Sequence, residues 1–274
     1  MMFDSCERKP VEVSGLKTPV VVATDVVFGR GGQRVLKLDL YQQADRVPSA
    51  LPAVVFIHGG GWHGGEKESY RDMAAQVASH GYLCISVDYR LAGEAPFPAA
   101  LEDCKCAMRW VRAHADELRI DPAAIAVLGH SAGGHLAAMV ALTPGRFEGE
   151  GGWPQESSTA QCAMCYSAPY DLAALERSLG TGLGQFLTSA PAAEASPLTY
   201  VRAGAVPFLV CHGDADDLVP VEQSDVFVSA LQEAEVPVDY VRLPGAGHDL
   251  SPFHEAIVVE AVRFLDGTLK QPRT

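Results

Sequence analysis

Hydrophobic and polar residues follow two different patterns along the chain, and the first pattern is an alternation near the N-terminus. Residues 20–28 and 35–41 are rich in β-branched and aromatic residues, and the second run contains L-K-L-D-L at 36–40. A period of two indicates a strand with one face buried. The glycine-rich residues 29–32 between the runs predict a turn. We therefore expect an antiparallel hairpin whose second strand is a half-exposed edge.

The second pattern is an alternation of uninterrupted apolar runs with amphipathic segments. Largely apolar runs predict buried strands at 53–57, 82–87, 125–128 and 207–211, and two further strands are predicted at 161–168 and 238–243. Apolar positions at steps of three or four predict helices at 68–80, 98–118, 135–140, 221–234 and 254–269, with shorter pieces at 172–179 and 185–188. Strand and helix in alternation predict an α/β fold. We expect about eight strands in a mostly parallel sheet, with helices on both faces.

The same patterns set the expected domain boundaries. Residues 1–19 are interpreted as a loose N-terminal leader, and residues 20–274 as a single domain. Residues 143–158 are rich in Gly, Pro, Glu and Ser and predict a surface loop. Residues 171–206 are the least regular part, so any small lid must come from there.

Composition and charge narrow the class of function. The chain has 274 residues, of which 48% are hydrophobic, and a net charge of −13. This charge disfavours nucleic acid and anionic membranes as partners, because both need clustered Lys and Arg. No apolar run reaches the ~18–20 residues that span a bilayer. The N-terminal residues lack the apolar stretch of a signal peptide, so we expect a cytoplasmic protein. The expected partner is a small molecule, and the sequence leaves the oligomeric state open between a monomer and a dimer.

The seven cysteines are expected to be free, buried thiols, because most lie in apolar runs of predicted strands and helices. Cys162-x-x-Cys165 has the spacing of a metal or redox pair. However, it has neither a second such pair nor a histidine at ligand spacing. We therefore expect no metal site.

The clearest chemical motif is a serine between a predicted strand and a predicted helix. Residues 129–133 read G-H-S-A-G, after the apolar run 125–128 and before the helical residues 135–140. Small residues on both sides of Ser131 permit a very tight turn. Such a turn lifts the hydroxyl above the sheet and directs helix N-terminal N–H groups toward it. The context predicts a nucleophile elbow.

A serine nucleophile needs a base and an acid that orients the base. Among nine histidines, His248 lies in a glycine-rich turn between the last predicted strand and the last helix, from which it can reach Ser131. His130 is expected to line the pocket, but it is badly placed to be the base, because its strand-to-turn geometry points it away from Ser131. His130 and His135 span a sharp turn without helical spacing, which argues against a metal pair.

The orienting acid is left open by spacing alone. The loop after the strand at 207–211 offers Asp214, Asp216 and Asp217. Asp171, after an earlier strand, is a weaker competitor.

The loop at 58–62, H-G-G-G-W, follows another predicted strand and predicts an oxyanion site. Its three glycines allow the backbone N–H groups to approach a developing negative charge, and the N–H of Ala132 adds another donor. A phosphate-binding loop is excluded because no Lys-Ser/Thr follows and no G-x-G-x-x-G spacing occurs. Trp62 and the residues after Asp171 are expected to shape the acyl pocket. Because ligands bind at the carboxyl ends of parallel strands, all four loops should converge.

These residues together resemble an α/β-hydrolase. The motifs that carry the resemblance are H-G-G-G-W at 58–62, G-H-S-A-G at 129–133, H-G-D-A-D at 212–216 with V-P at 219–220, and G-H at 247–248. More closely, the chain resembles carboxylesterases of the hormone-sensitive-lipase group. Its best match there is the small branch without an N-terminal cap, which includes feruloyl and acetyl-xylan esterases. The resemblance covers about residues 20–268.

The resemblance implies a serine carboxylester hydrolase that forms a covalent acyl-enzyme. It makes Ser131 the nucleophile and His248 the base, and it selects Asp216 as the acid. It implies short-chain or aromatic acyl esters, including feruloyl or acetyl esters of sugars, and it implies no cofactor. The implied oxyanion donors are the N–H groups of Gly60, Gly61 and Ala132.

Two alternatives remain at this level. One is an arylformamide hydrolase similar to kynurenine formamidase, whose family carries a similar H-G-G-x-W loop. The other, from a different class, is a ligand-binding protein on an inactive hydrolase scaffold. The presence of all three triad residues disfavours the second alternative.

Overall fold

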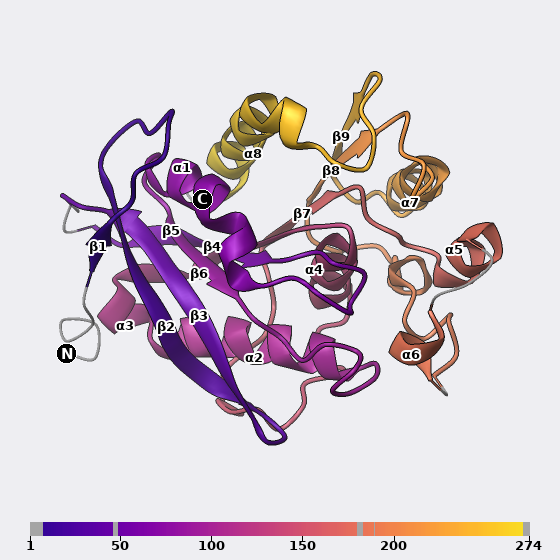
Figure 1. Ribbon diagram of the computed structural model, residues 1–274, viewed down its shortest axis with the longest axis horizontal. Helices are drawn as coiled ribbons and strands as arrows, with labels where there is room; N and C mark the ends of the chain where they lie inside the picture. Colours follow the sequence, from indigo (N-terminus) through magenta and orange to yellow (C-terminus); the bar gives the residue numbers. More distant parts are fainter. Residues whose placement is uncertain (1–7, 46–48, 180–182, 189, 271–274) are drawn as a thin grey trace.

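A mostly parallel sheet runs through the centre of the molecule in the computed structural model (Figure 1), which describes residues 8–45, 49–179, 183–188 and 190–270. Within these residues the sheet has nine strands, in the order β1-β2-β3-β5-β4-β6-β7-β8-β9. They are β1 (Lys9–Pro10), β2 (Val20–Gly31), β3 (Arg34–Gln43), β4 (Leu51–Ile57), β5 (Leu83–Val87), β6 (Ile120–His130), β7 (Cys162–Tyr166), β8 (Phe208–Gly213) and β9 (Val238–Leu243). The pairs from β5 to β9 are parallel, and β1, β2 and β3 pair antiparallel.

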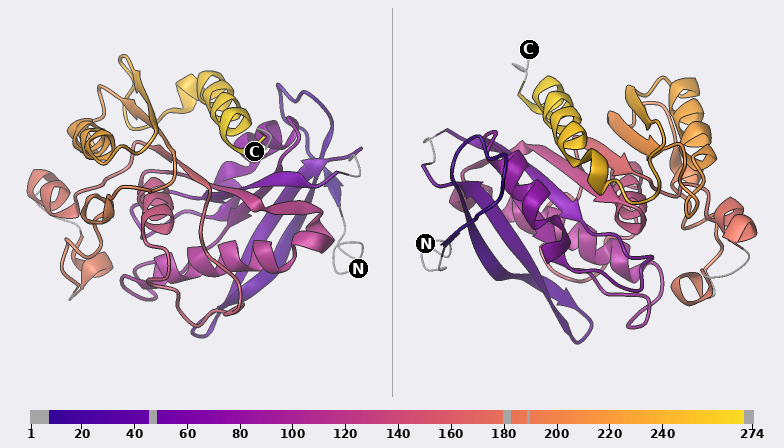
Figure 2. Two further views of the ribbon diagram at one scale, coloured as in Figure 1. Left: turned by 180° about the vertical axis from the view of Figure 1, so that it is seen from behind. Right: turned by 45° about the horizontal axis from the view of Figure 1, so that its top comes forward.

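Helices cover both faces of this sheet, as the views in Figure 2 show. Helices α1 and α8 pack on one face, and α2, α4 and α7 pack on the other. The helices are α1 (Arg71–Ala78), α2 (Ala99–Ala113), α3 (Ala115–Leu118), α4 (Ala132–Leu142), α5 (Leu172–Leu179), α6 (Gly184–Leu187), α7 (Glu222–Glu233) and α8 (His254–Leu269), with 3-10 turns η1 (Lys67–Tyr70), η2 (Pro197–Tyr200) and η3 (Ser251–Phe253). The predicted α/β class is thereby confirmed.

The strands with uninterrupted apolar sequences are the ones covered on both faces. Every residue of β4, β5 and β7 is buried. A strand between two helical layers has no face to present to water, so it gains from apolar side chains at every position. The uninterrupted apolar runs in the sequence therefore mark strands that helices cover on both faces.

The N-terminal hairpin forms as expected, but its place in the sheet was predicted wrongly. β3 is not an edge strand, because it pairs with β5 on the side opposite β2. Its exposed residues Val35 and Lys37 precede a stretch, residues 38–41, that is buried throughout. The alternation of buried and exposed residues therefore holds only in the part of β3 that extends beyond its pairing with β5.

The described part of the expected loose leader is attached to the domain. Residues 9–10 form the extra strand β1, which pairs with β2, and Val11 is buried. The backbone is held further along by hydrogen bonds from Gln76 Nε2 to Ser14 O and from Lys17 N to Ser79 Oγ. These bonds join residues more than 60 positions apart, so local sequence contains no sign of them. Residues 1–7 lie outside the described part.

The predicted helix over 98–118 is divided into α2 and α3, with His114 between them. The other predicted helices and strands agree with the structure to within a few residues, except that η1 precedes α1 and β6 begins at Ile120.

The surface loop at 143–158 is tied to α2 and to the hairpin. Glu148 accepts hydrogen bonds from Arg109 Nη1 at 2.7 Å and from the fully buried Lys105 at 3.3 Å. Arg109 Nε also donates to Gly152 O, and Trp153 Nε1 donates to Phe28 O at 2.9 Å. The loop is irregular in sequence but is held in place by these contacts at residues 148, 152 and 153.

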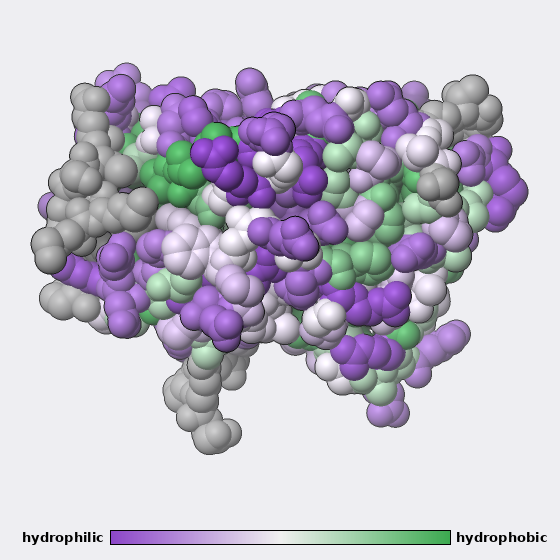
Figure 3. All heavy atoms as spheres, turned by 90° about the horizontal axis from the view of Figure 1, so that it is seen from below, coloured by the Kyte–Doolittle hydropathy of each residue, from purple (hydrophilic) through white to green (hydrophobic). Residues whose placement is uncertain are grey.

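The surface is mixed in character. Figure 3 shows one face, on which hydrophobic residues occur in small groups among hydrophilic ones. None of the helices in the described ranges is long and apolar enough to cross a bilayer. The cysteines at 84, 104, 106, 162, 165 and 211 are buried and unpaired, as expected, and Cys6 lies outside the described residues.

Candidate active site

Ser131 occupies a sharp turn between β6 and α4. Its φ of 55° and ψ of −124° are rare for a residue with a side chain. The Ser131 N–H donates to Tyr166 O at 2.8 Å, and the first helical turn closes with His135 N donating to Ser131 O. A Cβ on Gly133 would lie 1.9 Å from Ile57 O, so only glycine lets α4 approach β4 this closely. The turn has the predicted geometry of a nucleophile elbow.

His248 reaches Ser131 from the loop after β9. Its Nε2 lies 2.9 Å from Ser131 Oγ, across 117 positions of sequence. The loop is held against the one after β8, since Ala215 N donates to Ala246 O at 3.0 Å and Gly245 N donates to Asp214 Oδ1 at 2.7 Å. These contacts between loops bring the predicted base to the predicted nucleophile.

Asp216 is the carboxylate that meets His248. Its Oδ2 lies 2.8 Å from His248 Nδ1, and its Oδ1 accepts the N–H groups of Leu218 and Val219. Asp214 instead accepts from the backbone of Gly245, and Asp217 is exposed. Asp171, the fourth candidate, caps the N–H of Ala174 away from this site.

The electrostatics of Asp216 favour its ionised form. Burial alone raises the pKa of the carboxyl, but hydrogen bonds from His212, His248 and the Val219 N–H outweigh it and hold the pKa well below the usual 3.8. An ionised carboxylate only accepts, so His248 must donate through Nδ1–H. The lone pair of His248 Nε2 then faces Ser131 Oγ–H, which is the arrangement that a general base requires.

His212 supports the same carboxylate and had no role assigned from the sequence. Its Nε2 lies 2.9 Å from Val219 O and 3.2 Å from Asp216 Oδ2. Because a carbonyl oxygen only accepts, Nε2 carries the proton, and Nδ1 accepts from Ser224 Oγ at 2.6 Å. The signal that could have identified His212 is its position near the end of β8, four residues before Asp216.

The glycine loop after β4 lies beside the elbow. Gly60 and Gly61 have φ values of 112° and 60°, which residues with side chains rarely adopt. The loop is fixed at both ends, since Tyr89 Oη donates to His58 O at 2.9 Å and Ala92 N donates to Trp62 O at 2.8 Å. Ala132 is the first residue of α4, so its N–H has no acceptor within the helix.

Trp62, the last residue of this loop, is buried. Its indole stacks on Phe186 of α6 with ring centroids 4.4 Å apart. Its Nε1 donates to His135 Nδ1 at 3.2 Å, and His135 Nε2 donates to Ala195 O at 2.6 Å. Trp62 thus joins the glycine loop to α4 and to the segment at 171–206, and its contact with substrate stays a prediction.

His130 points away from Ser131, as expected for the residue before the elbow. Its Nε2 lies 2.9 Å from the backbone oxygen of His248, and the two rings are 4.9 Å apart. Its other side lines a cavity of about 210 Å³ that Gly59, Tyr166 and Leu250 also line.

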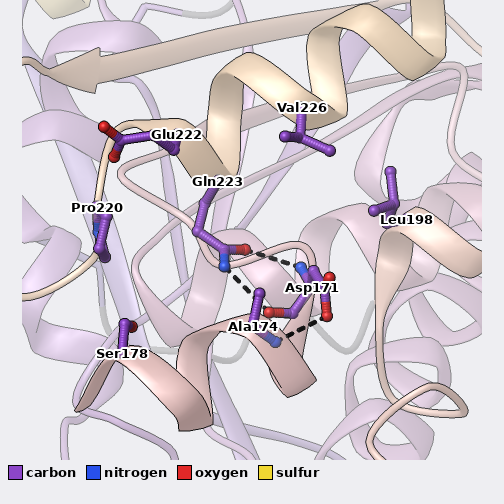
Figure 4. A pocket seen from close by; sticks show the side chains of 8 residues that line it. All are labelled: Asp171, Ala174, Ser178, Leu198, Pro220, Glu222, Gln223 and Val226. Carbon is purple, nitrogen blue, oxygen red and sulfur yellow. Dashed lines mark hydrogen bonds between the residues drawn. The ribbon is translucent and has the colours of Figure 1, made fainter.

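A separate cavity of about 200 Å³ lies between α5 and α7 (Figure 4). At its centre Gln223 accepts the N–H groups of Tyr170 and Asp171 and donates to Asp171 O. These polar groups satisfy one another and tie α7 to the start of α5.

Nowhere in the described ranges do three or more His, Cys, Asp or Glu side chains form a group that could hold a metal ion.

The chain is similar to known esterases in sequence. The sequence pattern of the BD-FAE family matches residues 38–231. The probable carboxylic ester hydrolase LipM of Mycobacterium tuberculosis is 32% identical over 256 residues, which cover 86% of this chain and 59% of LipM. The chain therefore spans about three fifths of the length of this curated relative.

Solved structures show the same similarity. The esterase Est2 of Thermogutta terrifontis, in its propionate-bound form, has a TM-score of 0.80 and 31% identity, covering 91% of this chain and 96% of Est2. A truncated carbohydrate esterase from gut microbiota has a TM-score of 0.83, covering 91% of this chain and 96% of that one. At 24% identity this second likeness concerns the fold alone.

Proposed function

The chain belongs to the BD-FAE family of α/β-hydrolases, and we propose that it is a serine carboxylesterase acting through Ser131, His248 and Asp216. The observation that carries the proposal is the continuous hydrogen-bonded path from Ser131 Oγ through both nitrogens of His248 to Asp216 Oδ2. A serine becomes a nucleophile near neutral pH only when such a base is in reach.

In the proposed reaction, Ser131 Oγ attacks the ester carbonyl carbon while its proton moves to His248 Nε2. The carbonyl electron pair moves onto oxygen, and the ionised Asp216 stabilises the imidazolium. When the tetrahedral intermediate collapses, the bond to the alcohol oxygen breaks, and that oxygen takes the proton from His248. Water, deprotonated by His248, then releases the acid from the acyl-serine in the same two stages.

The N–H groups of Gly60, Gly61 and Ala132 are the proposed donors to the oxyanion. The positive φ values of the two glycines and the helix N-terminal position of Ala132 support this role. Loss of one such donor typically raises the barrier by about 2.7–4 kcal/mol.

For the substrate we propose a small-molecule ester with a short or aromatic acyl group, including acetyl or feruloyl esters of sugars. Structures of the similar Est2 with propionate and with butyrate bound support a short acyl chain. We propose that the segment at 171–206 shapes the acyl side, because Phe186 within it packs on Trp62 of the glycine loop. We also propose a cytoplasmic location, supported by the six buried, unpaired cysteines.

The test compares hydrolysis of p-nitrophenyl acetate and butyrate by the wild type and by Ser131→Ala. We expect kcat to fall by at least ~10³-fold in the variant, since the covalent step is lost. Near-equal rates would exclude a serine esterase.

A second experiment ranks the substrates by comparing methyl ferulate, acetylated xylan and N-formylkynurenine at equal enzyme concentration. A higher kcat/KM on N-formylkynurenine than on every ester would favour the arylformamide hydrolase.

A further inference from the structure

The backbone of His248 is held by the residue that precedes the nucleophile. His130 Nε2 lies 2.9 Å from His248 O, and the two residues are 118 positions apart. The side chains at 130 and 131 therefore contact the same histidine at two points, since Ser131 Oγ meets the His248 ring. The imidazole rings of His130 and His248 lie with centroids 4.9 Å apart and planes 48° apart.

The protonation of His130 suits a permanent donor. Burial, together with the nearby His248, lowers the pKa of His130 to about 4, so the ring is neutral at pH 7. A neutral imidazole has one N–H, and a carbonyl oxygen can only accept. The proton must therefore sit on Nε2 and point at His248 O. The bond does not depend on a charge.

His130 lies at the end of a central strand, whereas His248 lies in a loop. His130 is the last residue of β6 and pairs with Tyr166 of β7 in the interior of the sheet. A Cβ on Gly59 would lie 2.9 Å from His130 O, so the strand ends are closely packed there. His248 instead follows Gly245 and Gly247 in a loop, where the backbone has more conformational freedom.

We propose that His130 is a positioning residue, whose Nε2–H donates to the carbonyl of His248 and holds the base in register with Ser131. This inference rests on the proposed function of that site. It differs from the role in substrate binding expected from the sequence, because the polar atom of the side chain is directed at the protein backbone. Misplacement of a reacting group by about 1 Å can cost on the order of 10²-fold in rate.

The experiment compares two variants whose new side chains have similar lengths, His130→Gln and His130→Met. The amide nitrogen of Gln can occupy the place of Nε2, whereas Met fills similar space without a donor. With p-nitrophenyl acetate we expect kcat to fall ~10–100-fold in His130→Met, with KM within about threefold of wild type. We expect His130→Gln to keep kcat within about fivefold of wild type. Equal kcat in the two variants would overturn the proposal.

His130→Asn provides a second comparison if His130→Met folds poorly. Its amide is one bond shorter and cannot reach His248 O, so we expect its kcat to be as low as that of His130→Met. An Asn variant as active as wild type would contradict the proposal. Urea unfolding midpoints of each variant separate loss of fold from loss of position.

A readout without turnover separates this inference from the proposed function. In proton NMR, the hydrogen between His248 Nδ1 and Asp216 should exchange with water faster in His130→Met than in His130→Gln. Equal exchange would overturn the role of His130 even in an active esterase. Failure of the wild type to hydrolyse any ester would instead contradict the proposed function, and the exchange comparison would still test His130.

Discussion

At the scale of single residues, one distance identifies which aspartate orients His248. Three aspartates share the loop at 214–217, and their spacing does not distinguish them. Only Asp216 places a carboxylate oxygen 2.8 Å from His248 Nδ1. Asp214 binds the backbone of Gly245 in the loop of the base. Asp214 and Asp216 thus have different roles although only two positions separate them.

This difference predicts a clear ranking of substitutions. Asp216→Asn should lower kcat on p-nitrophenyl butyrate by roughly 10⁴-fold, because an amide favours the wrong tautomer of His248. Asp214→Asn keeps an oxygen that accepts from Gly245, and Asp217 is exposed, so both Asn variants should stay within about threefold of wild type. Steady-state kinetics of the three variants tests the ranking. A large loss in either control with a small loss in Asp216→Asn would identify a different acid.

At the scale of an element, the elbow depends on contact between two backbones. A Cβ on Gly133 would lie 1.9 Å from Ile57 O and 2.6 Å from His58 O. Backbone atoms of a central strand cannot move away as the end of a flexible side chain can. The glycine at this position therefore reflects the packing of α4 against β4 as much as the turn itself.

Gly133→Ala should consequently lower the free energy of unfolding by about 3 kcal/mol, as overpacking against backbone does. Gly267→Ala is the matched control, since Gly267 is exposed in α8 and nothing lies within 4 Å of its added Cβ. The control should be more stable than wild type by about 0.5–1 kcal/mol. Urea unfolding measures the stability of both variants. If Gly133→Ala had the same free energy of unfolding as wild type, α4 would be able to shift away from β4 with little loss of stability.

At the scale of the whole molecule, buried histidines link separate layers and make stability depend on pH. His135 of α4 accepts from Trp62 of the glycine loop and donates to Ala195 O in the segment at 171–206. Burial lowers its pKa from 6.5 to about 4. Protonation of Nδ1 would replace its acceptor with a donor facing the Trp62 N–H, so folding resists it.

The direction in which stability changes with pH follows from the number of protons bound in the folded and unfolded states. Between pH 6.5 and about 4 the unfolded state binds a proton at this position that the folded state does not, so stability falls as pH falls. The contribution is complete above pH 6.5 and is lost by about pH 4, an effect on the order of 3 kcal/mol. Urea unfolding at pH 7.5 and 5.0 should show a smaller loss in His135→Gln than in wild type. A variant of the exposed His63, His63→Gln, should behave as wild type, and equal losses in all three proteins would contradict this account.

Much of the architecture follows from local sequence, because it depends on properties that a short stretch carries by itself. Apolar period and β-branched content identify the buried strands, since each such strand is covered on both faces. The G-H-S-A-G context identifies the elbow, since small residues are needed wherever a strand turns that sharply into a helix. The α/β-hydrolase class and the relation to carboxylesterases were therefore predictable from the sequence and are confirmed.

Only the tertiary structure decided which of these residues meet. The interior place of β3, the attachment of residues 9–17 and the tethering of the loop at 143–158 all depend on partners distant in sequence. So do the burial of Trp62 and the bonds that join His130 and His212 to the triad. A side chain has the same local pattern whether its partner is a substrate or a backbone oxygen 118 residues away. Its task is set by the chain that folds against it.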